Sequence, residues 1–152
     1  IIDCWSNRYL RIPFEDCGRS FDGADCWGLL RLVYRDELGI DLTDYFDDYE
    51  SCNDCDSIVE CFDREVGSWM EVSDPQAFDA VLIRIRNQPV HVGVVVTPQT
   101  FLHMLGSRGV SMEKSTRRLM MNRTFYRHRS AASSIQARLG SVTEKISSSN
   151  LI

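Results

Sequence analysis

Four short runs rich in β-branched residues follow one another between residues 79 and 115, and they constrain the fold more than any other feature. Turn-forming residues separate the runs at 87–89, 97–99 and 106–109. The runs are DAVLIRI (79–85), HVGVVV (91–96), TFLHML (100–105) and VSMEKS (110–115). Short β-rich segments divided by such turns are typical of an antiparallel meander. RTFYRHR (123–129) is expected to add another strand.

The N-terminal half has helical periodicity instead. In CWGLLRLVYRDEL (26–38) apolar residues recur at helical spacing, and Gly39 follows as a C-terminal cap. Asp25 is placed as the N-cap, because its carboxylate can accept a backbone N–H of the first turn. A short helical or irregular lead-in precedes this helix, and a second helix is expected over about 52–66. Helices first and strands afterwards predict an α+β fold, with N-terminal helices packed on a C-terminal antiparallel sheet.

The length of 152 residues suits one domain with a substantial core. We expect residues 1–129 to form this domain, and the Ser-rich segment 130–152 to be a tail or docking arm that a partner orders. The sequence contains no run of some eighteen apolar residues, so we expect no membrane-spanning segment. The N-terminus lacks the basic segment followed by an apolar segment that is typical of a signal peptide, although a chain that begins with Ile could already be trimmed.

Charge is unevenly spread along the chain. The net charge of −5 argues against general nucleic-acid binding. Acids dominate residues 36–65, whereas bases dominate residues 108–138, where Glu113 is the only acid. Two solvated faces of one domain explain this pattern, and docking onto a charged neighbour in an assembly is the alternative.

The six cysteines are too few for a chain held together mainly by disulfides. Cys52 and Cys55 form a C-x-x-C followed by Cys61, but no second pair stands downstream. No metal or cofactor is therefore predicted, and a zinc-binding module stays an alternative. Cys17 lies nine residues before Cys26, which raises the hypothesis of a disulfide that would silence Cys26.

Cys26 is the strongest candidate for a nucleophile. A cysteine attacks as its thiolate, and a free thiol with a pKa of about 8.5 is mostly protonated at neutral pH. The positive end of a helix dipole and a neighbouring imidazolium both lower that pKa. Cys26 is expected in the opening turn of its helix, which supplies the first of these effects.

Two of the three histidines lie in neighbouring predicted strands. A turn centred near residue 97 makes His91 and His103 direct cross-strand partners, with side chains on one face. His103 could then hydrogen-bond a ring nitrogen of His91 and orient it, as the third member of a nucleophile, base and orienting group. His128, in a basic stretch, is expected to be a surface or satisfied core histidine.

These residues match a known pattern: Cys26 in FDGADCWGLL, His91 in HVGVVV after FDAVLIRI, and His103 twelve positions later in FLHML. Over roughly residues 5 to 128 the chain resembles the NlpC/P60-type cysteine peptidases, papain-like enzymes of bacterial cell-wall turnover, and is most similar to their phage-tail subgroup. The resemblance implies Cys26 as nucleophile, His91 as base and His103 as the third residue. It also implies a supporting role near the oxyanion site for Asp25 and for position 14. Many relatives have tyrosine at that position, whereas this chain has Phe14.

The implied activity is hydrolysis of the peptidoglycan stem peptide, typically between D-glutamate and diaminopimelate, without metal or cofactor. The implied setting is a phage tail tip or baseplate, made in the host cytoplasm and acting at the host cell wall or periplasm. One alternative is a structural tail protein that keeps the fold with little or no catalysis. Another is an acyltransferase or amidase of the same fold.

Overall fold

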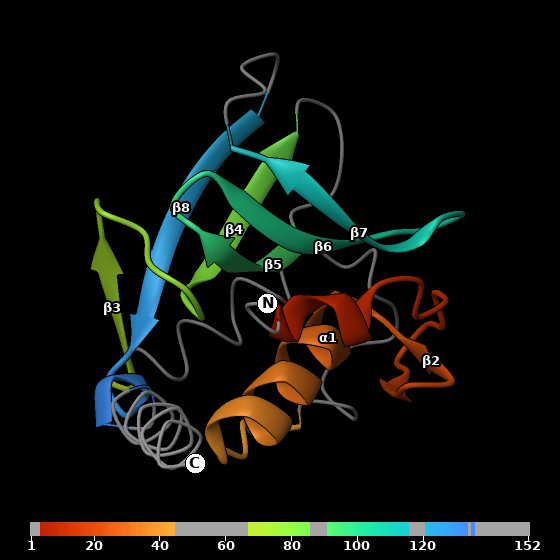
Figure 1. Cartoon of the computed structure of the whole chain (residues 1–152), viewed down its shortest axis with the longest axis horizontal. Helices are drawn as coiled ribbons and strands as arrows, with labels where there is room; N and C mark the ends of the chain where they lie inside the picture. The colour runs from red at the N-terminus through yellow and green to blue at the C-terminus, as the bar shows by residue number, and fades with distance from the viewer. Residues whose placement is uncertain (1–3, 45–66, 86–90, 116–120, 134, 136–152) are drawn as a thin grey trace, which may run out of the picture.

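The computed structural model describes residues 4–44, 67–85, 91–115, 121–133 and 135. Within them the chain is α+β: a short helix packs against a six-stranded antiparallel sheet, as predicted (Figure 1). The expected helix over 52–66, with Cys52, Cys55 and Cys61, lies outside the described residues, as does most of the expected tail. No helix in the described part of the chain is long and apolar enough to cross a membrane.

The lead-in to the main helix is a 3-10 helix and a small hairpin. The 3-10 helix η1 covers Trp5–Tyr9, and the two-residue strands β1 (Arg19–Ser20) and β2 (Gly23–Ala24) pair antiparallel. Helix α1 covers Cys26–Val33 and continues as one π-helical segment, η2, over Tyr34–Leu38. Gly39 then ends the helix with φ of 66°, the left-handed conformation expected of a C-terminal glycine.

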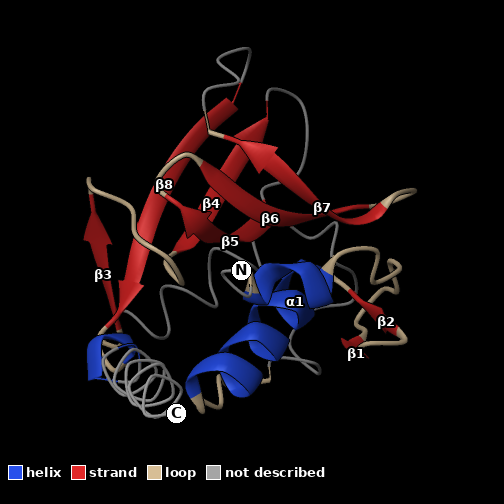
Figure 2. Ribbon diagram, viewed as in Figure 1, coloured by secondary structure: helices blue, strands red, loops and turns tan. Residues whose placement is uncertain are grey.

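The large sheet has the strand order β3-β8-β4-β5-β6-β7. Its central meander confirms the four predicted runs as strands that follow one another along the chain: β4 (Ala80–Ile85), β5 (His91–Thr97), β6 (Thr100–Leu105) and β7 (Gly109–Lys114). Strand β8 (Met121–His128) confirms the fifth run, but it returns to pair with β4 instead of extending the meander. Strand β3 (Trp69–Val72), which pairs with the other edge of β8, was not predicted (Figure 2).

The two faces of the sheet bury different clusters. One face packs with α1 in the main core, where Trp27 and Leu29 cluster with Val92, Val94 and Leu102. The alternating residues on the other face form a smaller cluster with Phe125 at its margin: Val81, Ile83, Val95 and Phe101. Both faces are therefore apolar, and strands β4, β5 and β6 are buried on both sides.

Candidate active site

The start of α1 is built as the sequence predicts. Asp25 has extended backbone, and its Oδ1 accepts a hydrogen bond from Gly28 N at 2.7 Å, which makes it the N-cap. Cys26 is the first helical residue and is only 4% exposed. The thiol therefore lies at the end of the helix where the unpaired backbone N–H groups and the dipole favour negative charge.

Gly28 allows the first turn of α1 to pack directly against the preceding loop. A Cβ atom built at Gly28 would lie 2.1 Å from the backbone oxygen of Gly18. A larger residue at either contact would displace the helix start that carries Cys26. The glycine two residues after the cysteine is therefore a packing requirement of this site.

Phe14 lies beside the segment that leads into Cys26. It forms an isolated parallel bridge with Ala24, and Glu15 N donates to Ala24 O at 3.1 Å. Its side chain is 38% exposed. The backbone therefore brings position 14 next to the start of α1, although the phenyl ring has no hydroxyl to offer an oxyanion.

The two histidines of the hairpin lie together, but not as direct partners. Gly93 pairs with His103, and the register shifts between Val95 and Thr97, so the expected pairing of His91 with His103 is wrong by two residues. The imidazoles are diagonal neighbours with centroids 5.4 Å apart and planes at 83°. Because side chains alternate with a period of two, a shift of two residues leaves both histidines on the same face.

Three imidazole nitrogens are buried without a hydrogen-bond partner among the described residues: His91 Nε2, His103 Nδ1 and His103 Nε2. The predicted hydrogen bond between the two rings is therefore not formed. Buried polar atoms are usually paired, and a catalytic role is one explanation for those that are not. These nitrogens mark the histidine pair as a candidate functional site.

Both histidines are held in the neutral form. Burial, with a smaller contribution from the neighbouring His103, lowers the pKa of His91 to about 4. Burial also lowers the pKa of His103, and the carboxylate of Glu113 partly opposes this. A neutral imidazole can accept a proton at neutral pH, which is what a general base requires.

Glu113 is a neighbour of this pair that the sequence analysis did not assign to the site. Its Oε2 lies 3.6 Å from His103 Nε2, too long for a hydrogen bond but close enough to stabilise a charged imidazolium. The carboxylate comes from strand β7, the next strand along the sheet. Its position as the only acid among the bases of 108–138 was the sequence signal that could have found it.

Cys26 and the histidines come from different layers. Helix α1 packs on the sheet face that carries Val92 and Val94, whereas His91 and His103 alternate onto the face of Val95 and Phe101. The structure thus brings the histidines together and places Cys26 on the helix that packs against their strands.

The remaining candidates have structural surroundings. His128 is buried against Trp69 and Tyr34, and its Nδ1 accepts from Ser130 N, as expected of a satisfied core histidine. The hypothesised disulfide between Cys17 and Cys26 is not formed. Ligand atoms of Asp16, Cys17 and Asp25 lie within 4.8 Å of one another, but Asp25 is bonded to cationic and backbone N–H donors, so we assign no metal there.

Comparison with known proteins agrees with this architecture. A model of the NlpC/P60 family matches residues 11–129. The structure is similar to the crystal structure of the NlpC/p60 domain of peptidoglycan hydrolase SagA, with a TM-score of 0.53 and 18% sequence identity. The match covers 78% of this chain and 90% of that domain. No curated protein sequence matches the chain significantly.

Proposed function

Because the chain belongs to the NlpC/P60 family, we propose that it is a cysteine peptidase that hydrolyses the stem peptide of peptidoglycan. The observation that carries this proposal is the pair of buried imidazoles with unpaired nitrogens, on strands against which the Cys26 helix packs. Cys26 is the proposed nucleophile, His91 the base, and His103 the residue that orients His91. Family membership makes cell-wall peptide bonds the expected substrate.

The proposed reaction proceeds in two steps through a thioester. His91 takes the thiol proton, Cys26 Sγ bonds to the carbonyl carbon, and His91 returns the proton to the nitrogen of the leaving amine as the peptide bond breaks. Water then attacks the thioester while His91 removes its proton, and the proton passes to the Cys26 sulfur as the acid leaves. We assign stabilisation of the oxyanion in both steps to the backbone N–H of Cys26 at the start of α1.

This mechanism requires a contact between Cys26 Sγ and His91 that is itself part of the proposal. His91 is the first residue of β5, so its ring lies at the end of the strand and not in the middle of a packed face. The start of β5 is therefore where we expect the thiol and the imidazole to meet. Substrate bound at this point would supply the partners that the buried nitrogens lack.

The finer assignment is to the bond between D-glutamate and diaminopimelate, in a phage tail tip or baseplate that acts at the host cell wall. This part rests on the resemblance of the motifs to the phage-tail subgroup. The concentration of bases in 108–138 supports docking within an assembly. A structural tail protein with little catalysis is the second candidate, because Phe14 supplies no hydroxyl beside the start of α1.

Digestion of purified diaminopimelate-type muropeptides, followed by mass spectrometry, tests the proposal. Wild-type protein should cut the stem peptide, and Cys26→Ala should abolish the cut while keeping the fold, because alanine suits a helix start. Cys17→Ala is the matched control and should retain activity. If wild-type protein makes no cut, the peptidase assignment fails and the structural candidate takes its place.

A further inference from the structure

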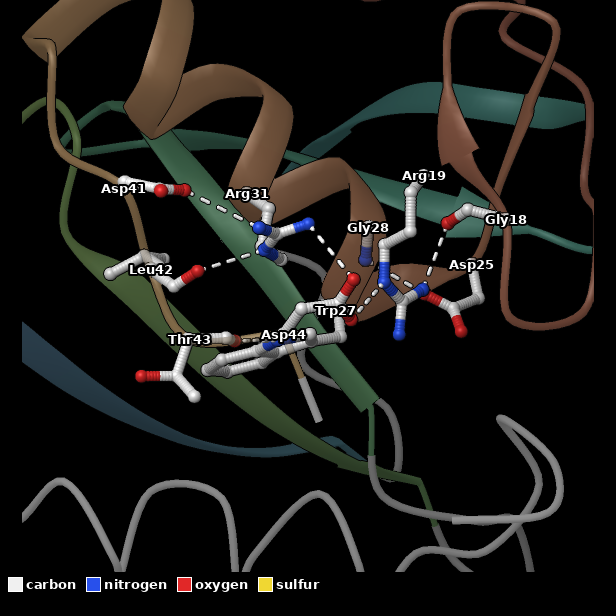
Figure 3. Close-up of polar contacts among 10 residues, drawn as sticks. All are labelled: Gly18, Arg19, Asp25, Trp27, Gly28, Arg31, Asp41, Leu42, Thr43 and Asp44. Carbon is white, nitrogen blue, oxygen red and sulfur yellow. Dashed lines mark hydrogen bonds and ion pairs between the residues drawn. The ribbon is translucent and has the colours of Figure 1, made fainter. Parts of the chain in front are cut away.

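Arg19 bonds directly to the residue that caps the nucleophile helix. Its Nη1 donates to Asp25 Oδ1 at 2.8 Å and to Gly18 O at 2.8 Å (Figure 3). Its Nε donates to Asp44 Oδ1 at 2.9 Å. Asp25 is fully buried, and the Arg19 side chain is only 14% exposed. The same carboxylate oxygen therefore serves both the helix cap and this arginine.

The carboxylate of Asp25 presents an electrostatic problem for Cys26. A buried negative charge next to a thiol opposes formation of the thiolate, and burial weakens the screening by water. The adjacent guanidinium of Arg19 compensates this charge without disturbing the hydrogen bond to Gly28 N. The guanidinium thus reduces the negative charge that opposes helix-end stabilisation of a thiolate at Cys26.

The charges of Asp25 and Arg19 also act on a second thiol, that of Cys17. Its Sγ lies within 4.8 Å of carboxylate oxygens of Asp16 and Asp25. Burial and then these two carboxylates raise the pKa of Cys17, whereas Arg19 lowers it. Asp25 and Arg19 thus act with opposite signs on a neighbouring thiol.

We propose that Arg19 is a positioning residue for the nucleophile, which holds Asp25 in its capping geometry and compensates its charge beside Cys26. This inference rests on the proposed function, because it concerns the reactivity of the proposed nucleophile. It adds a residue that lies outside the Cys-His-His triad. The charged and titratable groups around the start of α1 are Asp16, Cys17, Arg19, Asp25 and Asp44. Helix α1 also packs against β5, whose first residue is His91.

Arg31 provides a matched control from the same network. It pairs with Asp44 Oδ2 at 3.4 Å and with Asp41 at 3.3 Å, and its Nε donates to Leu42 O at 2.9 Å (Figure 3). Arg31 thus links the segment 41–44 to α1, and Arg19 links Asp44 to strand β1 and to the N-cap of α1. Arg19 also pairs with Asp25, whereas the partners of Arg31 among the described residues are in 41–44. A variant without Arg31 therefore loses bonds to the segment 41–44 but keeps the positive charge beside Asp25.

The experiment measures the rate at which iodoacetamide alkylates Cys26 as a function of pH, read on the Cys26 peptide by mass spectrometry. Arg19→Gln should raise the pH midpoint of alkylation by about one unit, so that the rate at neutral pH falls about tenfold. Arg19→Lys keeps the charge and should recover most of the rate. Arg31→Gln should keep the wild-type midpoint. A wild-type midpoint in Arg19→Gln, or an equal rise in Arg31→Gln, would overturn the proposal.

A second set of variants covers the case in which Arg19→Gln does not fold. Asp25→Asn keeps an oxygen that can cap α1 but removes the charge, so it should lower the midpoint, and in the double variant it should cancel the effect of Arg19→Gln. A midpoint in Asp25→Asn at or above that of the wild type would contradict the role assigned to this pair. Alkylation requires no substrate. A midpoint shift as predicted, with no muropeptide cleavage, would therefore reject the proposed function and keep the role of Arg19. Cleavage without a midpoint shift would keep the proposed function and reject the role of Arg19.

Discussion

The ring of His103 lies opposite Gly93 and diagonally across from His91, with 5.4 Å between the centroids of the two imidazoles. Gly93 has no side chain between the two rings. A Cβ atom built there would lie 3.3 Å from the Cβ of His103 and 2.5 Å from the backbone oxygen of Leu102. The glycine between His91 and Val95 is therefore part of the site, because it leaves the space that the histidine pair occupies.

Gly93→Ala should disturb this pair. The added methyl group cannot be accommodated by a flexible side chain, since its nearest neighbour is backbone, and we expect a loss of about 1–3 kcal/mol in the free energy of unfolding together with a loss of activity. Urea unfolding and muropeptide digestion measure the two effects. Gly106→Ala is the control, because a Cβ there meets nothing within 4 Å. Wild-type behaviour of Gly93→Ala would show that the spacing is not required.

The two histidines should differ in their importance for turnover. His91→Ala removes the proposed base, and we expect activity to fall by about two to four orders of magnitude. His103→Ala removes the orienting residue and should cost less, about one to two orders of magnitude, because it takes no proton itself. Steady-state rates on one muropeptide provide the comparison. Full activity of His91→Ala would remove it as the base, and a wild-type rate in His103→Ala would exclude it from the site.

The lowered pKa of His91 predicts a pH dependence of stability. The unfolded chain binds a proton at this residue below its usual pKa of 6.5, whereas the folded protein binds it only near pH 4. The free energy of unfolding should therefore fall as the pH drops from about 6.5 to about 4, with a contribution on the order of 3 kcal/mol.

Urea unfolding at several pH values, for the wild type and for His91→Gln, measures this contribution. Carboxylates titrate in both proteins, so the difference between the two curves isolates His91. The wild type should lose more stability than His91→Gln over this interval. The same dependence on pH in both proteins would show that His91 is not held neutral by the fold.

Glu113 should set the pKa of His103. Its carboxylate opposes the effect of burial, so Glu113→Gln should lower the pKa of His103 further. NMR titration of the imidazole resonances measures this change directly. Glu71→Gln removes the same charge from β3, the opposite edge strand, and should leave His103 unchanged. An unchanged or higher pKa in Glu113→Gln would mean that the carboxylate does not act on His103.

Local signals in the sequence predicted the local features of this fold. The N-cap at Asp25, the helix that starts at Cys26 and the strands of the meander depend on neighbouring residues, and all are confirmed. The pairing of His91 with His103 was wrong because the turn is formed by Pro98 and Gln99, further along the chain than expected, and the irregularity between Val95 and Thr97 offsets only one residue of this difference. The rings still lie together because an offset of two residues preserves the face.

Contacts between distant segments could not be predicted in the same way. Strand β3 has four residues, and it is defined by its pairing with β8 some fifty residues later in the chain. The bond from Arg19 to Asp25 depends on the β1–β2 hairpin, whose strands are too short to give an alternating pattern. The roles of Cys26, His91 and His103 remain predictions, since they depend on chemistry that the fold alone does not display.

The most direct test of the central claim, that Cys26 is the covalent nucleophile, is to trap the thioester during turnover. The protein is mixed with diaminopimelate-type muropeptides, quenched in acid within a fraction of the turnover time, and examined by intact-mass and peptide mass spectrometry. We predict an added mass equal to the acyl part of the stem peptide, located on Cys26 and missing in Cys26→Ala. Product formation with the acyl group on another residue, or no cleavage and no adduct at all, would contradict the account.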